Sequence, residues 1–344
     1  MPSAPVDAGA NSCKLTYGPV QLGTGPVAMA STSDGVRLAF NSAGLAVVIP
    51  APSAAHPRKQ GALAGSSPPC AFTDKSVFCM DVAGGVHQTD ATTGSAKVVA
   101  QARAGTRLGA ASVKGHDALA FLRDRKTSEG TTMEAWLWTD DDKTQRLSED
   151  GSGATFTTMA PRGEGALVLM LDARSAMTPV HARSLSFTDS IVVGGDAVVF
   201  LGGGAQPDTR ASLAVPKSGP TYALLPISHD IGFGLAIARI LGEPKTDEPV
   251  IWSDYKNGLD PAPIVGSVGA ASSYVARVVP LDAKVGSPRV IELGRIDDKG
   301  AFTSYGSIAA HGRPTEVALA IDGADLVVAY TDTQGAWLER RNCP

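Results

Sequence analysis

Apolar residues recur along the chain in short runs that have the length of β-strands and are separated by polar turns containing Gly, Asp and Asn. Runs such as GALVLML at 165–171 are uninterrupted, which indicates strands that are covered on both faces. The three-to-four-residue period of an amphipathic helix does not persist over three turns in any segment. The pattern therefore predicts an all-β protein.

One strand-rich unit is repeated. Segments 27–50 and 317–340 can be aligned, since each contains a short apolar strand, a Gly/Asp turn, a more apolar second strand, a further Gly-containing turn and a third strand. The second strand recurs eight times, with starts separated by 31 to 52 residues and a mean of about 41. Its copies are 35–40, 75–80, 117–122, 165–171, 196–202, 233–241, 273–281 and 325–330.

Four-stranded units of this length resemble the blades of β-propeller repeat proteins. The resemblance covers residues 13–343 and rests on the repeated pattern, because WD dipeptides, kelch Gly-Gly pairs and intact aspartate boxes are absent; TDTQGAW at 331–337 only approaches an aspartate box. It implies a ring of eight blades. The spacing of 31 residues between 165 and 196 leaves little room for a fourth strand, so seven blades is the alternative.

The last unit contains three strands and then the chain stops, which suggests that its outer strand comes from residues 13–20. Pairing the two terminal strands in one blade would close the ring. A Cys13–Cys343 disulfide would fasten that blade, and in the chain-entropy model a bridge that closes so long a loop stabilises the folded chain by restricting the unfolded one. We therefore expect a flexible tether over 1–12 and a single domain over 13–344.

The other two cysteines lie in the hairpin sequence CAFTDKSVFC. A two-residue turn at Asp74-Lys75 sets Thr73 opposite Ser76 and, three pairs further, Cys70 opposite Cys79. That pair is not hydrogen-bonded, so its Cα atoms are expected about 4.5 Å apart, within reach of a disulfide. Two disulfides predict the periplasm, the cell surface or secretion. The alternative is a cytosolic protein with four reduced cysteines.

Composition narrows the class further. The net charge of −4 and the absence of a basic stripe argue against nucleic acid as a partner. No run of about 18 apolar residues predicts a membrane span. The start PSAPVDAGANS is typical of the segment that follows a cleaved signal peptide or a lipid anchor. Abundant Ala, Gly and Val suggest a bacterium with a GC-rich genome.

No motif predicts a catalytic, metal or cofactor site. Ser253 and Lys256 have the spacing of the penicillin-binding dyad, but they lie on a strand that enters a turn rather than at a helix start. The run Asp140–Asp142 lacks the alternation of a calcium loop, and the histidines lack metal-ligand spacing. Trp136 and Trp138 share one strand face, where packing against a neighbouring blade is favoured over the stacking of a sugar.

The turns that link second to third strands differ in length, and in a propeller they emerge on one face. They are short in the first, second and last units, but long and polar at 123–132, 172–178, 202–211, 242–249 and 282–288. Long polar loops on a rigid scaffold often carry binding. The predicted site residues on this face are Arg123, Arg125, Asp172, Arg174, Asp208 and Arg210. The alternative is that these are surface loops without a binding role.

These features favour a non-catalytic binding or scaffold module of the bacterial cell envelope, without a cofactor, whose partner is a protein or a polysaccharide of that envelope. A carbohydrate-active hydrolase or lyase in the central funnel is the alternative function, since such an enzyme needs carboxylates that converge there. A structural spacer without any ligand is the third hypothesis.

Overall fold

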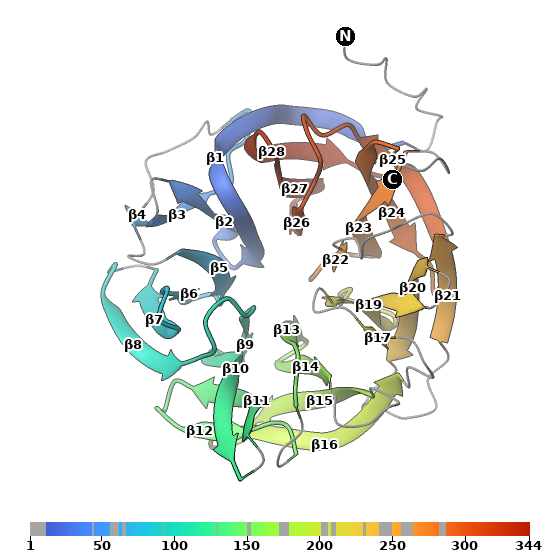
Figure 1. The fold of residues 1–344 in the computed structure, drawn as a ribbon. Coiled ribbons are helices and arrows are strands. Elements are labelled where there is room, and N and C mark those ends of the chain that lie inside the picture. Colours follow the sequence, from blue (N-terminus) through green and yellow to red (C-terminus); the bar gives the residue numbers. More distant parts are fainter. Residues whose placement is uncertain are drawn as a thin grey trace.

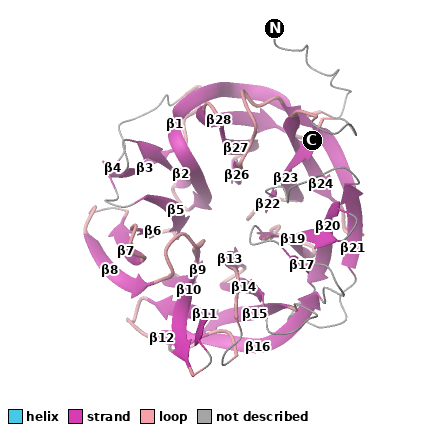
Figure 2. Ribbon diagram, viewed as in Figure 1, coloured by secondary structure: helices cyan, strands magenta, loops and turns pink. Residues whose placement is uncertain are grey.

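The computed structural model describes residues 12–344 except 43–44, 56–61, 64–66, 92, 129, 150–152, 172–178, 201–205, 208–210, 230–231, 241–249, 256–263 and 282–286. The regular elements of this described part are all strands, as predicted, and they form six sheets around a central opening (Figures 1 and 2). No helix within the described ranges is long and apolar enough to cross a bilayer. Residues 1–11 of the predicted tether lie outside them.

The sheets are built from consecutive strands. The largest has the order β26 (Glu316–Asp322), β27 (Asp325–Asp332), β28 (Gly335–Asn342), β1 (Lys14–Thr32), β2 (Gly35–Ser42), β3 (Leu45–Pro50) and β4 (Ala62–Leu63). The second contains β5 (Ser67–Phe72), β6 (Ser76–Met80), β7 (Gly85–Asp90) and β8 (Ala96–Gln101). The third contains β9 (Gly109–Val113), β10 (His116–Thr127), β11 (Gly130–Thr139) and β12 (Thr144–Arg146).

Three further sheets complete the ring. One contains β13 (Thr157–Arg162), β14 (Gly165–Leu171), β15 (Val180–Phe187) and β16 (Ile191–Phe200). The next contains β17 (Gln206–Pro207), β18 (Ser212–Ala214), β19 (Thr221–His229), β20 (Gly232–Ile240) and β21 (Val250–Tyr255). The last contains β22 (Ile264–Gly266), β23 (Ser273–Pro280), β24 (Arg289–Ile296) and β25 (Phe302–Ile308).

Strand β1 joins the two ends of the chain. Its first part pairs with β28, from Lys14 opposite Asn342 to Gly23 opposite Ala336, and its second part pairs with β2. The seven-stranded sheet therefore contains two four-stranded units that share β1. The predicted pairing of residues 13–20 with the last unit is present in this ladder.

The predicted count of eight units is not confirmed. Segments 165–171 and 196–202 were expected to be second strands of two units, but 165–171 forms β14 and the described residues 196–200 belong to β16 of the same sheet. Strand β16 has an apolar pattern because its neighbour covers it: Ala197 and Val199 are buried, and Val199 belongs to a core cluster that includes residues of β19 and β20. An outer strand that is packed against the next sheet therefore looks like a central strand in the sequence.

The core lies between neighbouring sheets. Trp138 of β11 packs edge-to-face on Phe78 of β6, with ring centroids 5.8 Å apart, and both side chains are almost completely buried. Trp136 packs against the same cluster, as the sequence predicted. Because each sheet is covered on both faces, its strands are continuously apolar.

Hydrogen bonds between the inner turns of neighbouring sheets add to this packing. The Ser33 N–H donates to Asp74 Oδ1 (2.9 Å), and the Asp74 N–H donates to Ser112 Oγ (3.1 Å). The Lys114 N–H then donates to the Glu164 carbonyl oxygen (2.8 Å). Four successive units are thus linked at one end of the central opening.

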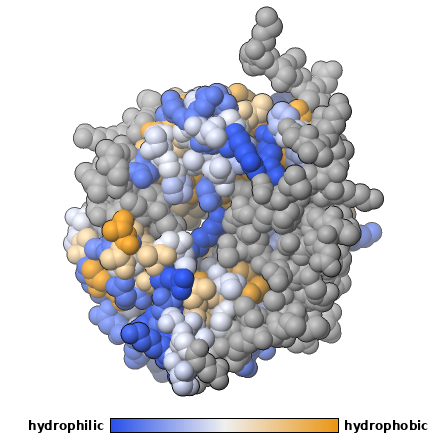
Figure 3. Space-filling model, viewed as in Figure 1, coloured by the Kyte–Doolittle hydropathy of each residue, from blue (hydrophilic) through white to orange (hydrophobic). Residues whose placement is uncertain are grey.

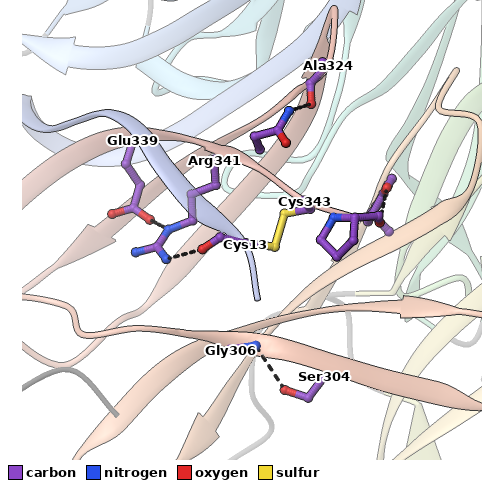
Figure 4. Close-up of a disulfide and its surroundings, with 10 residues drawn as sticks. Cys13, Ser304, Gly306, Ala324, Glu339, Arg341 and Cys343 are labelled. Carbon is purple, nitrogen blue, oxygen red and sulfur yellow. Dashed lines mark hydrogen bonds and ion pairs between the residues drawn. A yellow bond between two sulfur atoms is a disulfide. The ribbon is translucent and has the colours of Figure 1, made fainter. Parts of the chain in front are cut away.

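Both predicted disulfides are present. Cys70 lies opposite Cys79 in the β5–β6 ladder with Cα atoms 4.3 Å apart, and the Thr73 N–H donates to the Ser76 carbonyl oxygen, which is the predicted register. Cys13 and Cys343 are joined across a sequence separation of 330 residues, with Cα atoms 4.2 Å apart (Figure 4). No cysteine is free.

Candidate functional site

The segment 123–132, which was predicted to be a long loop, is a hairpin in the structure. Strands β10 and β11 stay paired up to Thr127 opposite Gly130. Strand β9 pairs with β10 only as far as Ala120, so residues 123–127 extend beyond the four-stranded part of the sheet. The segment is polar because it leaves the core, and the loop prediction was wrong because a two-stranded ladder can also be polar.

Arg123 and Arg125 lie on this hairpin and contact residues of the facing strand. The Arg123 guanidinium lies 5.5 Å from the centroid of the Trp136 ring. Arg125 Nη1 lies 2.9 Å from Glu134 Oε1, and the Glu134 side chain is completely buried. The remaining predicted site residues, Asp172, Arg174, Asp208 and Arg210, lie outside the described residues.

Two further arginines lie beside this hairpin. Arg103, in the segment before β9, pairs with Asp124 of β10 at 2.8 Å, and Arg146 of β12 lies 3.4 Å from Glu134. Neither residue was predicted from the sequence, because both reach the hairpin through contacts between separate segments. Arg103 does so through its ion pair with Asp124, and Arg146 through the pairing of β12 with β11, where it lies opposite Trp136. We call Arg103, Arg123, Arg125 and Arg146 the hairpin arginines.

The hairpin arginines form a cationic surface. Arg103 pairs with the carboxylate of Asp124, Arg125 and Arg146 pair with that of Glu134, and Arg123 lies over Trp136; both side chains of the Arg103–Asp124 pair are 47% exposed. Planar guanidinium groups bind carboxylate, sulfate and phosphate groups through paired hydrogen bonds. The arrangement can therefore hold an anionic group at the rim of the ring.

The central opening contains a channel of about 570 Å³. A hollow near the centre of the space-filling view marks this opening (Figure 3). Its described lining comes from the innermost strand of every unit and consists mainly of small side chains. The innermost strands that line it are β1, β5, β9, β13, β18, β22 and β26.

An ion pair crosses one end of the channel. Arg107, two residues before β9, donates from Nη2 to Oε2 of Glu316, the first residue of β26, at 2.8 Å. Strands β9 and β26 belong to sheets on different sides of the central opening (Figure 1). Along the ring, the unit of β1–β4 and the sheet of β5–β8 separate them.

The two carboxylates in the described lining, Asp74 and Glu316, lie at opposite ends of the channel. Asp74 is hydrogen-bonded to Ser112 near the end of β9, whereas Glu316 pairs with Arg107 before its start. A glycosidase needs two carboxyl groups on either side of one bond. Asp74 and Glu316 do not have that arrangement.

Three histidines form pairs with carboxylates outside the channel. His87 contacts Asp81 at 2.9 Å, and a hydrogen bond from this ring holds the pKa of Asp81 below its usual value. His116 lies 3.2 Å from Asp140, and His181 lies 3.0 Å from Asp196. These pairs belong to three different sheets, and the described residues contain no cluster of three or more metal-ligand side chains.

No protein-family model matches the chain, and no curated protein matches it. Solved structures do. The chain is similar to oligogalacturonate lyase from Vibrio parahaemolyticus, with a TM-score of 0.59, 10% identity and coverage of 97% of this chain and 92% of that chain. It is also similar to the N-terminal domain of Nup159 (TM-score 0.56, 10% identity, 98% and 97% coverage) and to streptogramin B lyase (0.52, 12%, 98% and 100%).

The fold is a β-propeller. Identities of 10–12% carry the fold and nothing finer, so the candidate sites of this propeller depend on its own residues. The hairpin arginines and the Arg107–Glu316 pair lie at the same end of the channel, since Ala120 of β10 is opposite Gly109 at the start of β9 and the hairpin continues beyond it. One face of the propeller therefore carries both sites.

Proposed function

We propose that this propeller is a non-catalytic binding module of the bacterial cell envelope that uses the hairpin arginines to hold an anionic partner. The observation that carries the proposal is the set of four arginines on and beside a hairpin that extends beyond its sheet, Arg123 and Arg125 on the hairpin and Arg103 and Arg146 beside it. An extended hairpin on a rigid ring presents these groups without a large ordering cost. The partner is an acidic polysaccharide or an acidic protein of the envelope.

Two disulfides support a compartment outside the cytoplasm, where thiols are oxidised. We infer that the β1–β28 ladder and the Cys13–Cys343 bridge keep the ring closed there. A thiol assay on the native protein tests the compartment. We expect no reactive thiols before reduction and four after reduction and unfolding.

The arrangement of the arginines favours an anion over a neutral sugar. Arg125 and Arg146 are held by the buried Glu134, which fixes their positions, while Arg123 lies over Trp136. A fixed guanidinium loses less side-chain freedom when it binds a carboxylate or a sulfate. Binding should weaken as salt rises, because exposed charges are screened.

The test uses two probes, polygalacturonate as an acidic polysaccharide and poly-γ-glutamate as an acidic polypeptide. The variant R103E/R123E reverses two exposed charges and leaves the partners of Glu134 in position. We expect its affinity for the preferred probe to fall at least tenfold. Lys97, which lies 5.7 Å from the ring centroid of Trp138, provides the matched control K97E, whose affinity should stay unchanged.

Unchanged binding by R103E/R123E would contradict the proposal, as would the absence of binding to either probe at low salt. The polygalacturonate should also stay intact during incubation. Depolymerisation would favour the alternative function, an enzyme that acts on carbohydrate in the channel.

A further inference from the structure

The channel has a polar end and an apolar interior. At the end crossed by the Arg107–Glu316 pair, Thr158 of β13 and Ser212 of β18 also line the wall. Gly109, two residues after Arg107, approaches the Thr158–Met159 peptide so closely that a Cβ there would lie 2.7 Å from the Met159 nitrogen. The first residues of β9 and β13 therefore lie side by side at this end of the channel.

Deeper residues of the channel are small or aliphatic. Ala28, Ala110, Ala160, Leu213, Val265 and Ala318 contribute to the wall. A volume of about 570 Å³ lies within the range of small-molecule sites. The channel can therefore hold the apolar part of a small ligand whose polar part stays at the end of the channel.

The ion pair leaves hydrogen-bonding capacity unused. One guanidinium nitrogen of Arg107 contacts one carboxylate oxygen of Glu316, and within the described part of the chain neither side chain has a further polar partner. A guanidinium group carries five N–H donors, and a carboxylate has a second oxygen. The side chains are 35% and 32% exposed, so these atoms are accessible to a ligand.

We propose that this end of the channel binds a small zwitterion, an α-amino acid with an apolar side chain. Its carboxylate binds the remaining N–H groups of Arg107, its ammonium group binds Glu316, and its side chain enters the apolar interior. The two charged groups of the ligand and the side chains of Arg107 and Glu316 then alternate in sign, so that each charge lies between two opposite charges. A simple anion would instead bring a second carboxylate next to Glu316, and like charges at that distance disfavour binding.

This site is separate from the hairpin arginines, so either proposal can fail without the other. The first test uses the unaltered protein and titration calorimetry with L-leucine. Two further probes each lack one charge of leucine: 4-methylpentanoate has no ammonium group, and 3-methylbutylamine has no carboxylate. Glucose serves as a neutral polar probe. We expect leucine to bind and each single-charge probe to bind at least tenfold more weakly.

The second test uses R107Q and E316Q, each of which should reduce the affinity for leucine at least tenfold. The variant K97Q removes the exposed Lys97–Asp142 pair outside the channel and should bind leucine as the unaltered protein does. Binding of 4-methylpentanoate as tight as that of leucine would overturn the proposal. Binding of glucose in place of leucine, or no binding of leucine at all, would also overturn it, and none of these outcomes depends on a variant folding.

Discussion

Arg340 Nε donates a 2.6 Å hydrogen bond to the carbonyl oxygen of Pro52, which lies 288 residues earlier in the chain. The same guanidinium donates to the Ala51 carbonyl oxygen at 2.9 Å and to Asp322 Oδ2 at 2.6 Å. Arg340 itself is only 4% exposed. One buried side chain of β28 thus links the two units that share β1.

Replacing Arg340 should destabilise the propeller markedly. In R340M the two carbonyl oxygens lose their charged donor in a buried position, and we expect the free energy of unfolding to fall by about 2–3 kcal/mol. R340K should recover only part of this loss, because an ammonium group cannot reproduce the planar fork of the guanidinium. Denaturant unfolding measures both variants. A loss as small as that of the exposed-site variant R103K would show that Arg340 is not a structural link.

The two disulfides should contribute unequally to stability. In the chain-entropy model, the Cys13–Cys343 bridge, with a separation of 330 residues, is worth about 6 kcal/mol, and the Cys70–Cys79 bridge, with a separation of 9, is worth about 3 kcal/mol. We expect C13S/C343S to lower the free energy of unfolding more than C70S/C79S in equilibrium unfolding. The reverse order would mean that the β1–β28 ladder holds the ends together without the bridge.

The variant D196N should be less stable than the unaltered protein near neutral pH, and this difference in stability should disappear at acidic pH. Burial by itself would raise the pKa of Asp196, but the hydrogen bond and charge of His181, followed by Arg183, outweigh it and hold that pKa below 3.8. A lowered carboxyl pKa gives stability that is present above the unfolded value and is lost as pH falls through the folded value.

We expect D196N to lose about 1 kcal/mol near neutral pH, since the side chain is only partly buried. The difference in melting temperature should shrink below about pH 4. Asp34 is 73% exposed and pairs with Arg37, so D34N should have little effect at either pH. A D196N penalty that stays constant down to pH 2 would exclude this ion-pair explanation.

Gly109 should tolerate no side chain. Its added Cβ would lie 2.7 Å from the backbone nitrogen of Met159 in the neighbouring sheet, so G109A must separate β9 from β13. We expect a loss of about 1–3 kcal/mol in the free energy of unfolding. The control G195A adds a Cβ with nothing within 4 Å and should change stability little. Equal melting temperatures for the two variants would contradict close packing between the sheets.

Sequence reasoning was strongest where the signal is local. Residues Cys70 to Cys79 contain both cysteines and the turn, so the alternation of a hairpin predicted their register. The apolar runs also predicted an all-β chain, because a strand covered on both faces carries that pattern wherever it lies in the ring. Cys13 and Cys343 could be paired from the sequence because the last unit needs an outer strand.

The count of units and the candidate sites were decided by tertiary structure. The apolar pattern of 196–202 indicates a strand that is covered by its neighbours. It does not indicate whether that strand is the second or the fourth of its sheet. Arg107 and Glu316 are 209 residues apart, and no local pattern indicates that they meet across the channel. The sequence by itself therefore determined strands, turns and cysteine pairs, which depend on neighbouring residues, whereas the curvature of the ring decided which distant side chains come into contact.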